Sequence, residues 1–169
     1  MDLMDMAEKA GKSGDEVLDY VRLSVVMMRQ NPDLIREVTI EPFPENLKTL
    51  LQDKIAIKAC YHNTWETMIR VRQDDPDCRY VLGYWCHIIP VGHCFLKYNN
   101  KYYDPTALLF NNNSETRYFS MFELSRNEVL EARRFMKNKF NRNDHISSWE
   151  WMRMGREKER IYGNDNPRG

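Results

Sequence analysis

The chain of 169 residues carries 25 Lys and Arg against 25 Asp and Glu, so its formal net charge is zero. This balance argues against a general nucleic-acid binder, which relies on excess cations to displace counterions. The length predicts one domain, which we place at residues 1–162, with a flexible tail at 163–169.

No run of the sequence approaches the roughly 20 apolar residues of a membrane-spanning helix, so no membrane contact is expected. The acidic stretch at residues 1–5 lacks the basic and apolar regions of a signal peptide. Four cysteines without such a signal favour reduced thiols and a cytoplasmic protein.

A capping box at Ser13 and Glu16 opens the first expected helix. Pro32 ends this helix because it forces Asn31 out of the α region. Further helices are predicted from three signals. These are apolar residues spaced three and four apart, a proline suited to the first turn of a helix, and a second capping box at Ser125. The predicted helices lie at residues 44–51, 59–71, 126–140 and 146–162.

Strands are expected where β-branched and aromatic residues gather between turn residues. They lie at residues 38–40, 79–89, 92–98, 101–104 and 117–124. Asn99 and Asn100 form a tight hairpin turn between two of them, since Asn tolerates a positive φ. Helices therefore precede and follow an antiparallel sheet, and this order predicts an α+β fold.

The two-residue turn at Asn99 and Asn100 sets the register of its hairpin. In that register His93 and Asp104 share one face as diagonal neighbours, about 7–8 Å apart. Asp104 can then hold the imidazole of His93 in one tautomer, as a catalytic triad requires. Cys94 follows His93 directly in the sequence, but alternation turns it to the opposite face.

Cys60 is the expected nucleophile because it stands at the start of the helix over residues 59–71. A thiol in that position meets the positive end of the helix dipole, which favours the thiolate. The backbone N–H of Cys60 has no partner within the helix and can point at a developing oxyanion. The candidate catalytic residues are thus Cys60, His93 and Asp104, in that order along the chain.

The run from His93 to Thr106 resembles the His–Asp hairpin of transglutaminase-like proteins. Those proteins carry a His followed by an aromatic residue, a short hairpin, and then an aromatic, Asp, Pro and Thr. Their nucleophilic Cys lies some thirty residues earlier at a helix start, the place that Cys60 takes here. The resemblance covers residues 58–106 and implies a papain-like core with a cysteine site.

The activity that we expect from this resemblance is hydrolysis of an amide, isopeptide or peptide bond through a thioester, without a cofactor or a metal. Transamidation by an amine acceptor stays open as the other outcome of the same thioester. The substrate would be a protein or a peptide-like molecule. Tyr61 and Tyr84 lie nearest the proposed site in the sequence and are the expected substrate-binding residues.

Two other interpretations of the same residues stay open. A non-enzymatic binding module can keep such a fold, because fold does not imply function. A zinc-stabilised structural protein is less favoured, because none of the potential ligands shows the paired spacing of structural zinc sites. Those ligands are Cys60, His62, Cys78, Cys86, His87, His93 and Cys94.

Overall fold

The computed structural model describes residues 16–51, 53–71, 75–109, 116–142, 145–148 and 150–155, and their side chains from residue 23 onward. Its helices are α2 (Glu16–Gln30), α3 (Glu45–Leu51), α4 (Cys60–Val71) and α5 (Arg126–Phe140), with 3-10 turns η1 (Pro32–Leu34) and η2 (Thr106–Leu109). Its strands are β1 (Arg36–Val38), β2 (Arg79–Cys86), β3 (Pro90–Tyr98), β4 (Lys101–Tyr103) and β5 (Arg117–Leu124). The predicted α+β class is confirmed.

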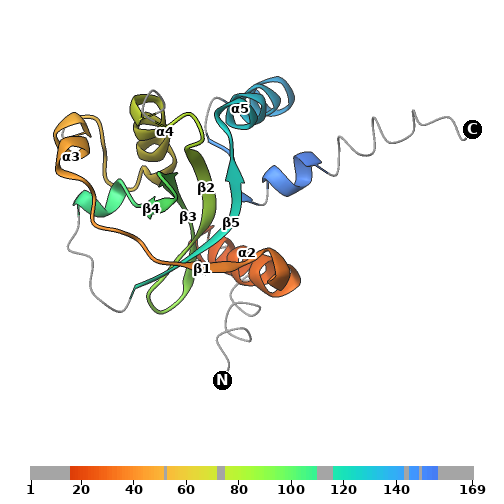
Figure 1. The fold of residues 1–169 in the computed structure, drawn as a ribbon. Helices are drawn as coiled ribbons and strands as arrows, with labels where there is room; N and C mark the ends of the chain where they lie inside the picture. The colour runs from red at the N-terminus through yellow and green to blue at the C-terminus, as the bar shows by residue number, and fades with distance from the viewer. Residues whose placement is uncertain are drawn as a thin grey trace, which may run out of the picture.

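The five strands form one antiparallel sheet in the order β1-β5-β2-β3-β4, which curls strongly (Figure 1). Two residues after β1, the chain reaches the opposite edge of this sheet. There Ile40 forms an isolated bridge with Tyr102 of β4, and the N–H of Glu41 donates to the Tyr102 carbonyl at 2.8 Å. The curl therefore brings the two edge strands close to one another.

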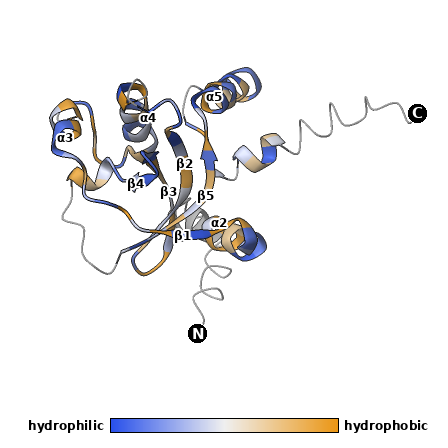
Figure 2. Cartoon of the chain, in the orientation of Figure 1, coloured by the Kyte–Doolittle hydropathy of each residue, from blue (hydrophilic) through white to orange (hydrophobic). Residues whose placement is uncertain are grey.

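Among the described residues the buried apolar side chains form three clusters, one of which joins α2 to the sheet. Alternation along the strands places the other two on opposite faces of the sheet. Tyr80 and Leu96 are fully buried on the face that packs against α3, α4 and α5. Val81, Phe95 and Tyr118 form the cluster on the other face, which the curl encloses. Figure 2 shows both apolar and hydrophilic residues on α2 and α3, as expected of helices that cover a core with one side.

The hairpin between β3 and β4 has the predicted register. Asn99 and Asn100 both take positive φ, 48° and 60°, and Leu96 pairs with Tyr103 as expected. The second capping box is confirmed as well: the Ser125 hydroxyl accepts from the N–H of Glu128, whose carboxylate accepts from the N–H of Ser125. Local turn and cap chemistry therefore favours these elements, and the turn is held further by a hydrogen bond from the Asn99 N–H to the Asp75 carboxylate at 2.7 Å.

Four expected strands have other bounds in the structure. The strand predicted at 92–98 begins at Pro90, and the strand predicted at 101–104 ends at Tyr103. The strand predicted at 79–89 ends at Cys86, because Cys86 pairs with Pro90 and the chain reverses through 87–89. The strand predicted at 38–40 lies two residues earlier, at Arg36–Val38, because these residues pair with β5. The helix predicted at 146–162 is helical at residues 148 and 150–155. Its other end, Ser13 and the tail at 163–169 lie outside the described residues.

Gly83 lies at a β-bulge, where the backbone of β5 approaches that of β2 closely. A Cβ added to Gly83 would lie 2.0 Å from the backbone oxygen of Phe119, a distance that no side chain tolerates. Gly83 also pairs with His93 across the β2–β3 ladder, so this close approach shapes the strand that carries the histidine.

We expect Gly83→Ala to destabilise the fold by about 2 kcal/mol or more, because backbone atoms rather than a flexible side chain must move. Gly155→Ala is the matched control, since an added Cβ there meets nothing within 4 Å. Thermal unfolding followed by circular dichroism compares the two variants. Equal melting temperatures for both would contradict the steric argument.

Candidate active site

His93 and Asp104 meet where β3 and the end of β4 lie side by side. The His93 Nε2 lies 2.8 Å from Asp104 Oδ2, and the two side chains are 13% and 3% exposed. The β3–β4 ladder ends at Leu96 and Tyr103, so Asp104 turns out of the strand pairing. The register predicted that the two residues are diagonal neighbours. Because Asp104 leaves the strand pairing, its carboxylate instead hydrogen-bonds directly to the His93 ring.

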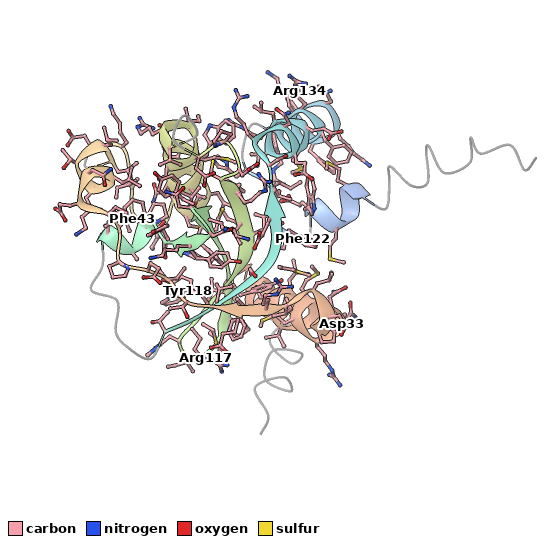
Figure 3. The ribbon with its side chains drawn as sticks, in the orientation of Figure 1. Asp33, Phe43, Arg117, Tyr118, Phe122 and Arg134 are labelled. Atoms are coloured by element: carbon pink, nitrogen blue, oxygen red, sulfur yellow. The ribbon has the colours of Figure 1, made fainter. Side chains whose placement is uncertain are left out.

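The Asp104 carboxylate accepts two further hydrogen bonds in addition to the one with His93. The Tyr118 hydroxyl donates to Oδ2 at 2.9 Å, and the backbone N–H of Thr106 donates to Oδ1 at 2.9 Å. Tyr118 comes from the start of β5 and is labelled in Figure 3. This contact could not be predicted from the sequence, because it depends on the curl that brings β5 toward the end of β4.

These contacts shift the titration of both partners. Burial favours the neutral acid of Asp104, but the His93 charge and the three hydrogen bonds outweigh burial and lower the pKa of this carboxyl. Burial likewise opposes the charged imidazolium of His93. Attraction and hydrogen bonding by Asp104, with smaller contributions from Cys60, outweigh it and raise the pKa of His93 to about 10. The imidazolium form therefore prevails at neutral pH.

Cys60 is the first residue of α4, as predicted, and its side chain is half-buried. The thiol is a neighbour of the His93 ring and contributes, after Asp104, to the raised pKa of His93. Because Nε2 of His93 is engaged with Asp104, Nδ1 is the ring nitrogen left for the thiol. The structure thus brings the three predicted residues together, with a hydrogen bond between His93 and Asp104 and with Cys60 as a neighbour of His93.

The other three cysteines lie in different surroundings. Cys94 is fully buried with the cluster beneath α4, on the face opposite Phe95, as the register predicted. Burial raises the pKa of the Cys78, Cys86 and Cys94 thiols, so each is held in its neutral form. All four cysteines carry free thiols. Among the described residues, no three His, Cys, Asp or Glu side chains gather as metal ligands would.

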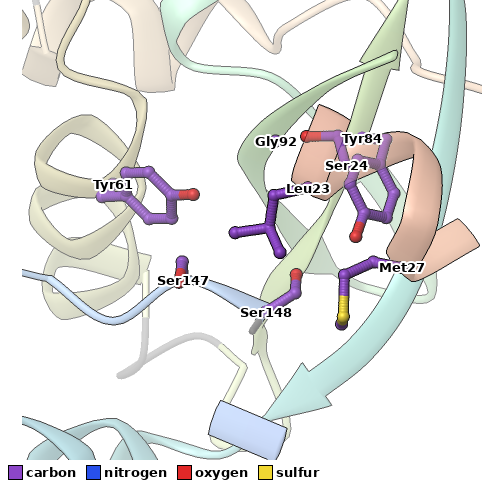
Figure 4. Close-up of a pocket in the computed structure, with 8 residues that line it drawn as sticks. All are labelled: Leu23, Ser24, Met27, Tyr61, Tyr84, Gly92, Ser147 and Ser148. Atoms are coloured by element: carbon purple, nitrogen blue, oxygen red, sulfur yellow. The ribbon is translucent and has the colours of Figure 1, made fainter. Parts of the chain in front are cut away.

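A small pocket of about 30 Å³ is lined in part by sequence neighbours of Cys60 and His93 (Figure 4). Tyr61, which follows Cys60, and Gly92, which precedes His93, both line it. The pocket therefore brings together Tyr61 and Tyr84, the two residues that the sequence suggested for substrate contact. The lining consists of Leu23, Ser24, Met27, Tyr61, Tyr84, Gly92, Ser147 and Ser148.

Comparison with known proteins adds no further identification. No family model matches the chain, and neither a curated protein nor a solved structure matches it. Within the described part of the chain, no helix is long and apolar enough to cross a membrane.

The His93 titration is directly measurable. We expect the ring of His93 to stay protonated through neutral pH and to lose its proton near pH 10. In Asp104→Asn the carboxylate attraction is gone and burial is left to act, so the pKa of His93 should fall toward or below its usual 6.5. Nuclear magnetic resonance of ring-labelled histidine follows this titration in both proteins. An unchanged His93 titration in Asp104→Asn would contradict the pairing.

Proposed function

We propose that this chain is a cysteine-dependent acyl-transfer enzyme that hydrolyses amide, isopeptide or peptide bonds. The observation that carries the proposal is the hydrogen bond between the His93 ring and the buried Asp104 carboxylate, with Cys60 at the start of α4 as a neighbour of His93. A helix that begins at the cysteine and packs on an antiparallel sheet bearing the histidine supports a papain-like, transglutaminase-like core. Cys60 is the nucleophile, His93 the general acid and base, and Asp104 the residue that orients His93.

The first half-reaction forms a thioester. The Cys60 thiolate attacks the carbonyl carbon of the substrate, and the negative charge moves to the carbonyl oxygen. Backbone N–H groups in the first turn of α4 lack acceptors within the helix and are suited to stabilise that oxygen. The C–N bond then breaks, and the His93 imidazolium gives its proton to the departing amine.

The second half-reaction resolves the thioester. Neutral His93 takes a proton from water, whose oxygen attacks the thioester carbonyl and releases a carboxylic acid. The thiolate of Cys60 and the imidazolium of His93 are then restored together. An amine that enters in place of water would give transamidation through the same thioester.

Thiol alkylation tests the proposal without a known substrate. At about pH 6 ordinary thiols are almost entirely protonated, whereas a thiolate paired with an imidazolium stays reactive. We expect iodoacetamide to modify Cys60 first, at least about tenfold faster than the half-buried Cys86. His93→Ala should abolish this preference, and mass spectrometry of the digested protein locates the modified cysteine.

The outcome that would contradict the proposal is slow, uniform labelling of all four cysteines in the folded protein. It would favour a binding module that keeps the fold without the chemistry. Thermal unfolding of His93→Ala serves as the control that the lost preference is not lost folding.

The pocket lined by Tyr61 and Tyr84 is our proposed contact for the acyl part of a protein or peptide-like substrate. Leu23 lies between these two tyrosines in Figure 4 and narrows the pocket. Its volume of about 30 Å³ holds about two water-sized groups, so short acyl groups should be preferred.

Leu23→Ala should widen the pocket and therefore favour longer acyl groups. We expect the ratio of Cys60 acylation by p-nitrophenyl butyrate to acylation by p-nitrophenyl acetate to rise about threefold or more, in line with the worth of one or two methylenes in an apolar pocket. Leu34→Ala, at an exposed position outside the pocket, is the matched control. A ratio that Leu23→Ala leaves unchanged would remove the pocket from substrate contact.

A further inference from the structure

Asn63 is a fully buried amide side chain one turn into α4 from Cys60. Its Oδ1 accepts from the N–H of Ala56 at 2.9 Å, and its Nδ2 donates to the Ala56 carbonyl at 2.8 Å. The same Nδ2 donates to the Thr106 hydroxyl at 3.0 Å. Both amide protons and the amide oxygen are therefore engaged away from water.

The partners of Asn63 lie next to two members of the proposed triad. Ala56 belongs to the loop that leads into Cys60, and Lys58 in that loop has a left-handed φ of 59°. Thr106 follows Asp104 by two residues, and its backbone N–H holds Asp104 Oδ1 at 2.9 Å. The Asn63 side chain thus connects the loop that precedes Cys60 with Thr106, the residue whose N–H binds the Asp104 carboxylate.

We propose that Asn63 is a positioning residue that sets the spacing between Cys60 and the His93–Asp104 pair. This inference rests on the proposed function and deepens it. An amide supplies one acceptor and two donors in a single plane, which neither a carboxylate nor an apolar side chain of this size can do. Because the left-handed residue lies between Ala56 and Cys60, the loop needs such an anchor to hold the thiol in place.

The amide also links two parts of the chain that approach the site from different elements. Cys60 belongs to α4, whereas Asp104 lies between the end of β4 and the start of η2. The hydrogen bond from Asn63 to Thr106 spans 43 residues of sequence and joins these elements directly. A shift of reacting groups by about 1 Å is enough to slow an enzyme about 100-fold, so this connection bears on reactivity as well as on folding.

Thr106→Val tests this role, because it replaces the hydroxyl acceptor with a methyl group of similar size and keeps the backbone N–H that binds Asp104. We expect alkylation of Cys60 by iodoacetamide at about pH 6 to slow about tenfold, and the pKa of His93 to fall. Thr106→Ser restores the hydroxyl and should restore both measurements. Asn63→Ala, which removes all three hydrogen bonds, should slow alkylation further.

Thr67→Val is the matched control for loss of a buried threonine hydroxyl. Thr67 lies on the same helix, and its hydroxyl donates at 2.7 Å to the backbone carbonyl of Asn63, so its loss leaves the three hydrogen bonds of the Asn63 amide in place. We expect this variant to lower the melting temperature while the alkylation rate of Cys60 and the titration of His93 stay as in the unmodified chain. If Asn63→Ala does not fold, the comparison of Thr106→Val with Thr67→Val decides the question.

The outcomes separate this inference from the proposed function. If Cys60 of the unmodified chain reacts no faster than Cys86, the proposed function fails and the role of Asn63 falls with it. If Cys60 reacts fast, but folded Thr106→Val keeps the same rate and the same His93 titration, only the positioning role is overturned. A lower melting temperature with both site measurements unchanged would show that Asn63 is structural alone.

Discussion

The buried carboxylate of Asp104 is the constraint on which the rest of the site depends. A charge that is 3% exposed is strongly disfavoured unless it is paired and hydrogen-bonded. Here the compensation comes from His93, Tyr118 and the backbone of Thr106, each from a different element. If any one of these donors is removed, the buried charge of Asp104 is stabilised by only the remaining two. The carboxylate and its three donors therefore act as a unit.

This shell exists only because the sheet curls. Tyr118 belongs to β5, which is separated from β4 by β2 and β3 in the strand order. A flat sheet would keep these strands about 15 Å apart, at nearly 5 Å per strand. The bridge between Ile40 and Tyr102 and the close approach at Gly83 are the contacts that accompany the curl. Packing of the enclosed cluster thus controls the electrostatics of the proposed catalytic histidine.

The two faces of the curled sheet have different roles: one packs against the helices, and the other carries His93. Cys94 and Leu96 face the helices and anchor α4, whereas His93 lies on the side of Phe95 and Tyr118. Cys60 reaches the histidine because α4 begins beside the part of β3 that lies beyond the short strand β4. The short length of β4 is therefore functional in our account, since it leaves that part of β3 open to the helix terminus.

Local chemistry explains what the sequence could predict. The Asn99–Asn100 turn fixed the hairpin register, and the capping box at Ser125 fixed the start of α5. The order of Cys60, His93 and Asp104 could be proposed for the same reason, since two of them lie on one hairpin. The contact of Tyr118 could not be predicted, because no local pattern tells which strands the curl brings together. The role of Asn63 could not either, because its bond to Thr106 joins residues 43 positions apart.

The most direct measurement of the central claim is the detection of an acyl-enzyme. The chain is mixed with p-nitrophenyl acetate at neutral pH, quenched in acid within seconds, and analysed by intact and peptide mass spectrometry. The account predicts one acetyl group, held as a thioester on Cys60, formed together with a burst of nitrophenol, lost with time to water and absent from Cys60→Ala. Acetylation that is undetectable on Cys60, or equal in Cys60→Ala, would contradict it.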